Sequence, residues 1–223
     1  MHITIAPSIL AADLSCLKEE IARAVEGGCD AFHLDIMDHH FVPNLSFGSA
    51  IVKTIRQLTT LPLGVHLMVD NPMDMVKTFV DAGGDSIIFH IEAVSDVSSV
   101  LEAISHLGVK TGISLKSDTP VSSVIPYLDG LDILLVMTVY PGFGGQAFIE
   151  ESYSRIREIV KFSSLLTSPP HIAVDGGVDF KNAPLLVEAG VDYLVAGTSI
   201  FKDHGAVRNV ILMREAAERG GLV

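Results

Sequence analysis

Short apolar runs alternate with longer segments of helical periodicity along the whole chain. The runs are rich in β-branched residues and predict strands over 3–8, 31–37, 63–69, 85–91, 109–115, 132–139, 171–176 and 192–197. The amphipathic segments between them predict helices over 14–26, 49–58, 73–82, 97–107, 149–165, 183–189 and 206–219. Several of these helices end in glycine directly before the next strand, as in "EGGCD", "DAGGD" and "EAGVD", which is typical of a helix C-cap and a tight turn.

This alternation of strand and helix predicts the fold class. Eight strands separated by helices indicate parallel βαβ units, and no long polar or proline-rich linker divides the 223 residues. We therefore predict an α/β protein, a (β/α)₈ TIM barrel that forms a single domain over 1–223. An open doubly wound sheet is the alternative, but no G-x-G-x-x-G follows the first strand.

Composition narrows the classes of partner. Hydrophobic residues make up 48% of the chain, yet the longest apolar run, "ILLVMTVY", is far too short to cross a bilayer, and no signal-peptide pattern precedes the first strand. The net charge of −12 argues against nucleic acid and anionic membranes as partners. Two isolated cysteines, Cys16 and Cys29, fit a reduced cytoplasmic chain. We expect a cytoplasmic protein that binds a small molecule and meets the charge of any anionic ligand locally.

Polar side chains interrupt the second apolar run, "FHLDIM". Because side chains alternate along a strand, His33, Asp35 and Met37 share one face, opposite an apolar face. In a barrel the C-terminal strand ends form the rim that holds the active site, so His33 and Asp35 meet His66 and Asp175 there. Any one of the four fits a buried polar residue or a helix cap. Together they are a ligand set for one borderline divalent ion, Zn²⁺, Fe²⁺, Mn²⁺ or Co²⁺.

Glycine-rich loops follow the last three predicted strands. They read "YPGFGGQ" (140–146), "DGGV" (175–178) and "AGTSIF" (196–201). Glycine lets backbone N–H groups approach a ligand closely, and loops after strands seven and eight are the usual phosphate site of this barrel. Ordinary turn glycines are the alternative for each loop alone. Three such loops at neighbouring strand ends predict a phosphate site.

Methionines form a third feature. Met37, Met68 and Met137 lie near strand ends, where they either fill the core or line a cleft that holds little water. Lys116 ends the fifth strand and is one of few cations that could reach the rim, although a solvated surface lysine is the alternative.

These stretches resemble the ribulose-phosphate 3-epimerase family. The resemblance runs in order through "APSILAAD" (6–13), "HLDIMDHHFVPNLSFG" (33–48), "HLMV" (66–69), "VMTVYPGFGGQAFI" (136–149), "VDGGV" (174–178) and "AGTSIF" (196–201), and it covers essentially the whole chain. It implies a barrel of the ribulose-phosphate-binding type with one divalent metal. We also expect a homo-oligomer, whose size the sequence leaves open. The implied reaction is epimerisation at C3 of a ketose phosphate, D-ribulose 5-phosphate to D-xylulose 5-phosphate.

Carried over residue by residue, the resemblance implies roles for individual side chains. His33, Asp35, His66 and Asp175 match the metal ligands, with Asp35 as proton acceptor and Asp175 as proton donor. The positions that match substrate contacts are Ser8, His66, Gly142, Phe143, Gly144, Gly145, Asp175, Gly176, Gly177, Gly197 and Thr198.

The chain departs from the family pattern at three places. The family usually has glycine where His39 stands, "NP" where Lys116 and Ser117 stand, and Asn, Glu or Asp where Tyr140 stands. His39, Lys116 and Tyr140 are therefore candidates for sugar specificity. "VMTV" and "GTS" also resemble the allulose-6-phosphate 3-epimerases, which leaves the identity of the ketose open.

The chemistry of the residues agrees with the resemblance. A metal on the C2 carbonyl would stabilise the enediolate formed when the C3 proton leaves, and Asp35 and Asp175 would serve as base and acid on opposite faces. No nicotinamide or flavin is needed. A sugar-phosphate decarboxylase is a rival, but such enzymes carry D-x-K on a barrel strand where this chain has "HLM". A catalytically silent sugar-phosphate sensor is a second rival.

Overall fold

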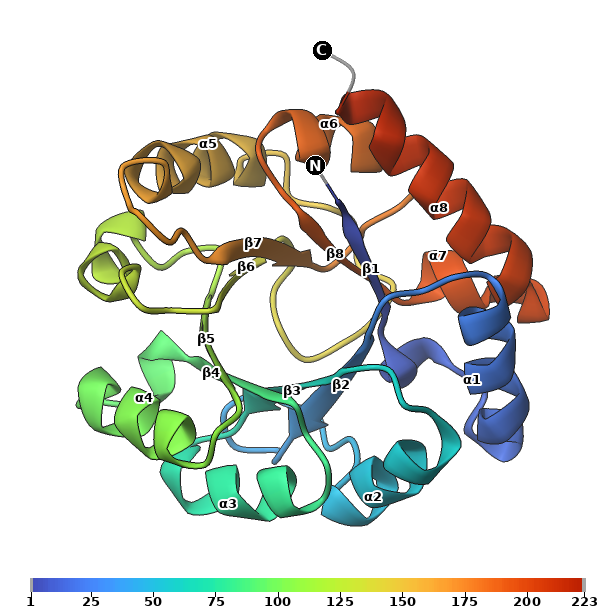
Figure 1. Ribbon diagram of the computed structural model, residues 1–223, viewed down its shortest axis with the longest axis horizontal. Coiled ribbons are helices and arrows are strands. Elements are labelled where there is room, and N and C mark those ends of the chain that lie inside the picture. The colour runs from blue at the N-terminus through green and yellow to red at the C-terminus, as the bar shows by residue number, and fades with distance from the viewer. Residues whose placement is uncertain (1, 222–223) are drawn as a thin grey trace.

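Eight parallel strands form the centre of the molecule in the computed structural model, which describes residues 2–221 (Figure 1). The ends of the expected 1–223 domain lie outside the described residues. The strands are β1 (Thr4–Pro7), β2 (Phe32–Met37), β3 (Leu63–Met68), β4 (Ser86–His90), β5 (Lys110–Leu115), β6 (Ile133–Met137), β7 (His171–Asp175) and β8 (Tyr193–Ala196). Neighbours follow the order β1-β8-β7-β6-β5-β4-β3-β2, so consecutive strands from β2 to β8 pair with one another and β1 pairs with β8.

The ring closes between β1 and β2. There the pairing is a single parallel bridge from Ser8, just past the end of β1, to His33 on β2. At the opposite end of these strands, the Ile5 amide donates to an Asp30 carboxylate oxygen at 2.7 Å, and the Asp30 amide donates to the Ile5 carbonyl. The (β/α)₈ TIM barrel predicted from the alternating pattern is thus confirmed.

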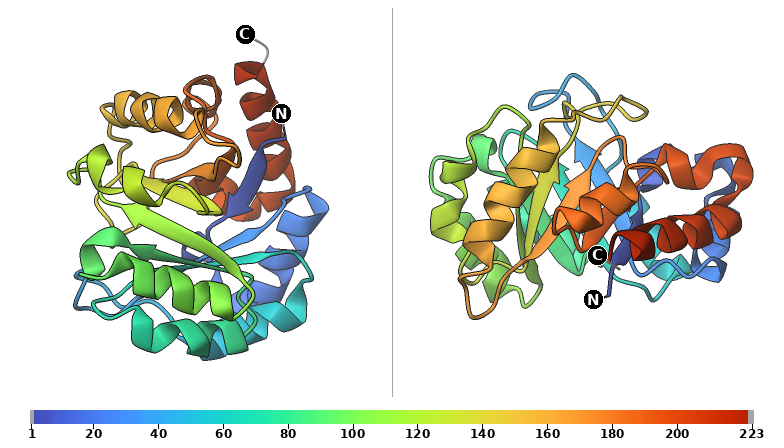
Figure 2. Two further views of the ribbon diagram at one scale, coloured as in Figure 1. Left: turned by 60° about the vertical axis from the view of Figure 1, so that its left-hand side comes forward. Right: turned by 90° about the horizontal axis from the view of Figure 1, so that it is seen from above.

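Helices surround the barrel (Figures 1 and 2). They are α1 (Leu17–Glu26), α2 (Ser49–Leu58), α3 (Met73–Asp81), α4 (Val97–His106), α5 (Ser152–Ser163), α6 (Ala183–Glu188), α7 (Thr198–Phe201) and α8 (Ala206–Gly220). The helix expected from residue 14 begins with a 3₁₀ turn, Leu14–Cys16, and α5 starts at Ser152 instead of residue 149. The segment 116–132 contains two 3₁₀ turns, Val121–Ser123 and Ile125–Tyr127, and no α-helix. The four-residue α7 was not predicted.

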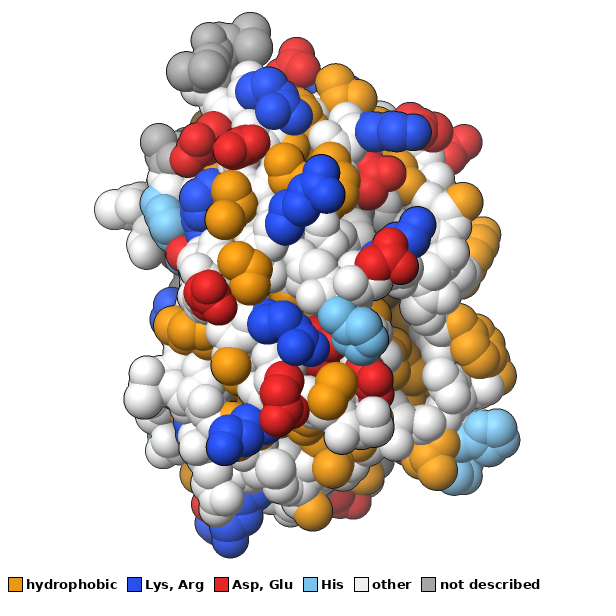
Figure 3. Space-filling model, turned by 90° about the vertical axis from the view of Figure 1, so that its right-hand side faces the viewer, with side chains coloured by type: hydrophobic (Ala, Val, Ile, Leu, Met, Phe, Trp, Pro, Cys, Tyr) orange, Lys and Arg blue, Asp and Glu red, His pale blue; other side chains and the backbone are white. Residues whose placement is uncertain are grey.

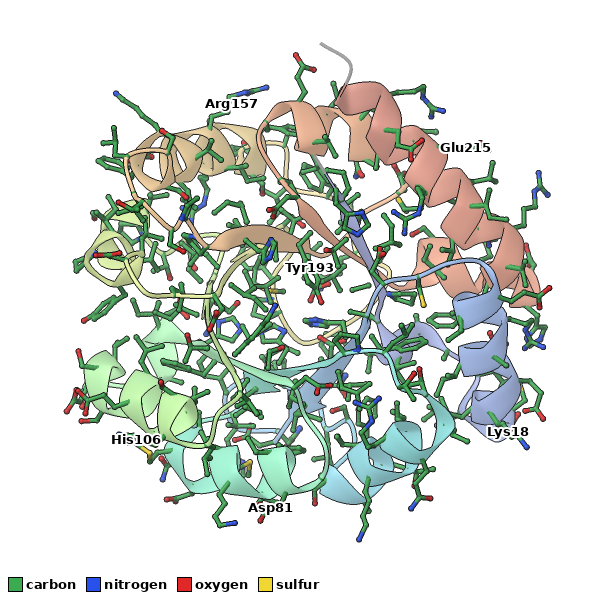
Figure 4. All side chains as sticks on the ribbon, viewed as in Figure 1. Lys18, Asp81, His106, Arg157, Tyr193 and Glu215 are labelled. Atoms are coloured by element: carbon green, nitrogen blue, oxygen red, sulfur yellow. The ribbon has the colours of Figure 1, made fainter. Side chains whose placement is uncertain are left out.

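Alternation along the strands separates two apolar layers. Phe32, Leu34 and Ile36 of β2 pack outward into the layer between strands and helices. A smaller cluster that includes Ile88, Leu135 and Tyr193 fills the barrel. Figure 4 shows Tyr193 inside the ring, whereas side chains labelled on the helices point away from it. The inward face of β2 is therefore the one that carries His33 and Asp35, as its polar pattern predicts.

The predicted glycine caps are present at the helix ends. Gly28, Gly83 and Gly190 have φ of 84°, 106° and 104°, and their amides bond to carbonyls in the last turn of α1, α3 and α6. This left-handed conformation ends the helix and returns the chain to the barrel. Among residues 2–221, no helix combines the length and the apolar character needed to span a bilayer.

Candidate active site

Four side chains from three strands converge at the C-terminal rim. His33 Nε2 lies 3.3 Å from Asp35 Oδ1 and 3.7 Å from Asp175 Oδ2. His66 Nδ1 lies 3.5 Å and 3.8 Å from the same two oxygens, and 3.3 Å from His33 Nε2. These four residues, singled out in the sequence, form a group of donor atoms that could hold a metal ion.

The spacing of these donors fits a tetrahedral ion. Metal–ligand bonds of about 2.0–2.2 Å place tetrahedral ligand atoms roughly 3.4 Å apart. The five distances that join the two imidazole nitrogens to each other and to the two carboxylate oxygens range from 3.3 to 3.8 Å. Both imidazoles are fully buried and each presents one ring nitrogen to the centre. The residues present therefore fit a small divalent ion without rearrangement of the strands.

Two further residues, His90 and Glu92, support His66 from behind. His66 Nε2 lies 3.0 Å from Nε2 of the fully buried His90, whose Nδ1 lies 3.1 Å from Glu92 Oε2. The other Glu92 oxygen accepts hydrogen bonds from the Lys116 amide at 2.8 Å and from the Thr119 hydroxyl. The sequence analysis missed both His90 and Glu92, although His90 ends a strand as His66 nearly does.

This chain of contacts sets the tautomers. If His66 Nδ1 offers its lone pair to an ion, its proton is on Nε2 and is donated to His90 Nε2. His90 then carries its own proton on Nδ1 and donates it to Glu92, so each contact has one donor and one acceptor. Burial lowers the pKa of both His66, to about 3, and His90, which keeps the two rings neutral as the scheme requires. Burial raises the pKa of Glu92, but its hydrogen bonds lower it to about 2.

The two aspartates of the site differ in their environments. Burial raises the pKa of Asp35, but His33 and His66 outweigh burial and hold it below its usual range. Ser8 donates its hydroxyl to the other oxygen of this carboxylate, Asp35 Oδ2, at 2.6 Å. Burial and the Asp35 charge raise the pKa of Asp175 to about 7, against the opposing effect of His33. The pKa values of the two carboxyl groups are thus shifted in opposite directions by their surroundings.

A cavity of about 660 Å³ opens above these carboxylates. Its described lining includes Ser8, Asp35 and Asp175, the three methionines 37, 68 and 137, and the predicted glycine-loop residues Gly142, Phe143, Gly144, Gly145, Gly176, Gly177, Gly197 and Thr198. His33 and His66 are fully buried and are not among the described lining residues. A ligand in the cavity would therefore meet the two carboxylates directly.

The glycine loops on one side of the cavity need their glycines. Gly176 and Gly177 have φ of 116° and 64°. A Cβ at Gly177 would come within 2.8 Å of the Phe148 amide nitrogen of the preceding loop. Side chains are thus excluded, and backbone forms this wall. Lys202, which the sequence analysis missed, is the one Lys or Arg among the described lining residues.

The three specificity candidates lie outside the described cavity lining. His39 has φ of 61°, a left-handed conformation that glycine adopts most easily and that histidine tolerates better than most residues. Lys116 Nζ lies 3.9 Å from the centre of the Phe41 ring, which in turn contacts the His90 ring. Tyr140 is 62% exposed. The backbone at position 39 is thus one that glycine would adopt without strain, and the specificity role of the three residues stays a prediction.

Comparisons with known proteins agree with this site. The sequence matches the ribulose-phosphate 3 epimerase family over residues 4–201. It is 42% identical to a ribulose-phosphate 3-epimerase of Bacillus subtilis (strain 168) over 89% of this chain and 92% of that protein. It is 43% identical to one of Methanocaldococcus jannaschii over 96% and 91%.

Among solved structures, the fold resembles a 3-keto-L-gulonate-6-phosphate decarboxylase from Vibrio cholerae, with a TM-score of 0.71 and coverage of 98% of both chains. That chain is only 13% identical, so the similarity concerns the fold alone. The two epimerases, by contrast, match nearly the whole length at over 40% identity. The chain therefore belongs to the ribulose-phosphate 3-epimerase family, and the isomerase class that the sequence predicts is confirmed.

Proposed function

We propose that the protein interconverts D-ribulose 5-phosphate and D-xylulose 5-phosphate by inverting C3. The observation that carries this proposal is the pair of carboxylates, Asp35 and Asp175, which come from different strands, line one cavity and lie beside the same two imidazoles. Inversion needs a base on one face of the sugar and an acid on the other. An ionised and a protonated carboxyl meet this need, and each is restored by the reverse reaction.

The remaining residues support these two proton carriers. Asp35, ionised, would accept the C3 proton, and its hydrogen bond from Ser8 fixes which carboxylate oxygen faces His33 and His66. Asp175, on the other side of the site, would deliver a proton to the opposite face. A divalent ion held by His33, Asp35, His66 and Asp175 would supply a Lewis acid that stabilises charge on the carbonyl oxygen beside C3. Three methionine side chains in the lining limit water near the reacting carbon.

Backbone and Lys202 together would hold the phosphate. The wall formed by Gly176, Gly177 and Gly197 allows amides to approach an anion closely, and Lys202 adds a positive charge to a chain of net charge −12. This arrangement supports a phosphorylated substrate in preference to a free sugar.

Lys202→Gln should weaken phosphate binding and leave the chemical step unchanged. We expect KM for the ketose phosphate to rise roughly fivefold with kcat nearly constant, because an exposed charge contributes modestly and equally in ground and transition states. Steady-state kinetics at low ionic strength would measure this change. Lys181→Gln is the control, since Lys181 is exposed and lies outside the described lining. A fall in kcat with unchanged KM would contradict the assignment.

The identity of the sugar is tested with a panel of ketose phosphates. We expect kcat/KM to be highest for D-ribulose 5-phosphate, with allulose 6-phosphate as the leading alternative. Exchange of the C3 hydrogen in D₂O separates an epimerase from a silent sensor, and release of CO₂ from 3-keto-L-gulonate 6-phosphate identifies a decarboxylase. Preference for allulose 6-phosphate would replace the proposed substrate but retain the reaction. Absence of exchange with every substrate of the panel, in metal-loaded protein, would overturn the proposal.

A further inference from the structure

A second group of metal-binding side chains lies outside the active site, where the start of α1 meets the turn before α8. Asp13 precedes the 3₁₀ turn Leu14–Cys16, Cys16 directly precedes α1, and His204 ends the 3₁₀ turn Lys202–His204. One donor atom from each of the three lies within 4.8 Å of the others. Figure 1 shows α1 beside α7 and α8, and Figure 3 looks onto that side of the molecule, where positive and negative side chains are mixed. None of the three residues belongs to the described cavity lining.

The donor types favour a thiophilic borderline ion. A thiolate, an imidazole and a carboxylate are the ligands that Zn²⁺ uses in proteins, at about 2.0–2.3 Å. Mg²⁺ and Ca²⁺ prefer oxygen ligands only. Asp13 Oδ1 already accepts hydrogen bonds from the amide and the hydroxyl of Ser15, at 2.9 and 2.7 Å, so the loop holds this carboxylate in place and its other oxygen is available.

A buried glutamate orients the imidazole. Glu20 is fully buried, and its Oε1 lies 2.7 Å from His204 Nδ1. A proton on Nδ1 donated to Glu20 leaves His204 Nε2 with a free lone pair, which is the carboxylate–histidine arrangement found behind metal-bound imidazoles. Arg23 lies 2.5 Å from the same oxygen and balances the glutamate charge. Glu20 Oε2 is buried and has no hydrogen-bond partner among the described residues, a cost that a nearby cation would reduce.

We propose that Asp13, Cys16 and His204 form a second, separate site for Zn²⁺, with Glu20 holding His204 in its ligating orientation. The positive charge of Arg23 offsets the negative charge of Glu20. The carboxylate of Asp13 and the thiolate of Cys16 would then supply two negative charges, which match the charge of Zn²⁺. A bound ion would itself stabilise the thiolate form of Cys16, because metal ions deprotonate the thiols that coordinate them. Bound Zn²⁺ would join the turn before α1 to the turn after α7. Lys202, at the cavity, is two residues from His204, so the ion would also fix one end of the phosphate side.

Co²⁺ titration of the full-length protein tests this site. A thiolate bound to Co²⁺ gives a charge-transfer band in the near ultraviolet. None of the four active-site ligands is a cysteine, so Co²⁺ bound there cannot produce this band. We expect wild type to bind a second equivalent of Co²⁺ with this band, and the band to persist in His66→Ala. It should vanish in Cys16→Ser and in His204→Asn, while Cys29→Ala, which removes the other cysteine, retains it.

These substitutions suit their positions. Serine is favoured at the residue before a helix, where Cys16 lies, and asparagine tolerates the left-handed backbone of His204, which has φ of 52°. Zn²⁺ should suppress the Co²⁺ band by displacing Co²⁺ and should raise the Tm of His66→Ala but not that of the His66→Ala, Cys16→Ser double variant. Absence of the band in wild type, or its persistence in Cys16→Ser, would overturn the second site and leave the epimerase proposal untouched.

Discussion

Asp175→Asn should lower kcat for epimerisation by about 10²- to 10⁴-fold, the range that loss of a positioned proton carrier produces. The amide keeps an oxygen in the donor group but cannot exchange a proton with C3. Asp35 remains ionised, because His33, His66 and the Ser8 hydroxyl still surround it. We therefore expect the variant to exchange the C3 hydrogen of one epimer with D₂O, from the Asp35 face, without forming the other epimer.

The measurement separates exchange from inversion. NMR in D₂O follows loss of the C3 hydrogen, and a coupled assay follows appearance of the second epimer. Asp179→Asn is a matched control, because Asp179 lines the same cavity but its carboxylate accepts from the Lys181 and Asn182 amides. Turnover of Asp175→Asn at the wild-type rate would show that Asp175 is structural. Loss of exchange from both epimers, with metal retained, would show that Asp35 is not an independent base.

Strand periodicity was sufficient to find the four candidate metal ligands of the active site. His33, Asp35, His66 and Asp175 occupy inward positions at strand ends, and barrel closure brings such positions to one rim regardless of loop conformation. The same rule also applied to His90, which follows the inward-facing Ile88 by two residues. It was overlooked because "DSIIFHI" is apolar around it and its partner Glu92 lies beyond the strand, in a 3₁₀ turn.

Loop positions were less predictable. His39, Lys116 and Tyr140 follow strand ends as the ligands do, yet all three lie outside the described cavity lining because the direction of a side chain in a loop depends on the loop path. Lys202 could not be found from strand spacing either. It follows α7, a helix of four residues that is too short to show a periodic pattern. The group around Cys16 joins residues 13 and 204, a proximity that only the packing of α1 near α8 creates.

We expect the affinity of the active site for its metal ion to depend strongly on His66 and more weakly on Glu92, which supports His66 through His90. His66→Ala removes one of four donors, and we expect the ion to be lost on dialysis together with all measurable epimerisation. His33→Ala should behave in the same way. Glu92→Gln leaves all four ligands in place but replaces the carboxylate that accepts a hydrogen bond from His90 with a neutral amide, which is a weaker acceptor. We therefore expect metal affinity to fall on the order of 10- to 100-fold.

The experiment must count only the active-site ion. We would make each variant in the Cys16→Ser background, which removes the proposed second site, and measure affinity by competition with a chelator. His106→Ala is the control, because His106 ends α4 on the outer surface, where Figure 4 shows it pointing away from the barrel. Full occupancy in both His33→Ala and His66→Ala would contradict the four-ligand centre. If Glu92→Gln keeps its affinity for the ion while His66→Ala binds no metal, the four-ligand centre stands but Glu92 has no role in it. A glutamate that only stabilised the fold would alter Tm and leave the affinity for the ion unchanged.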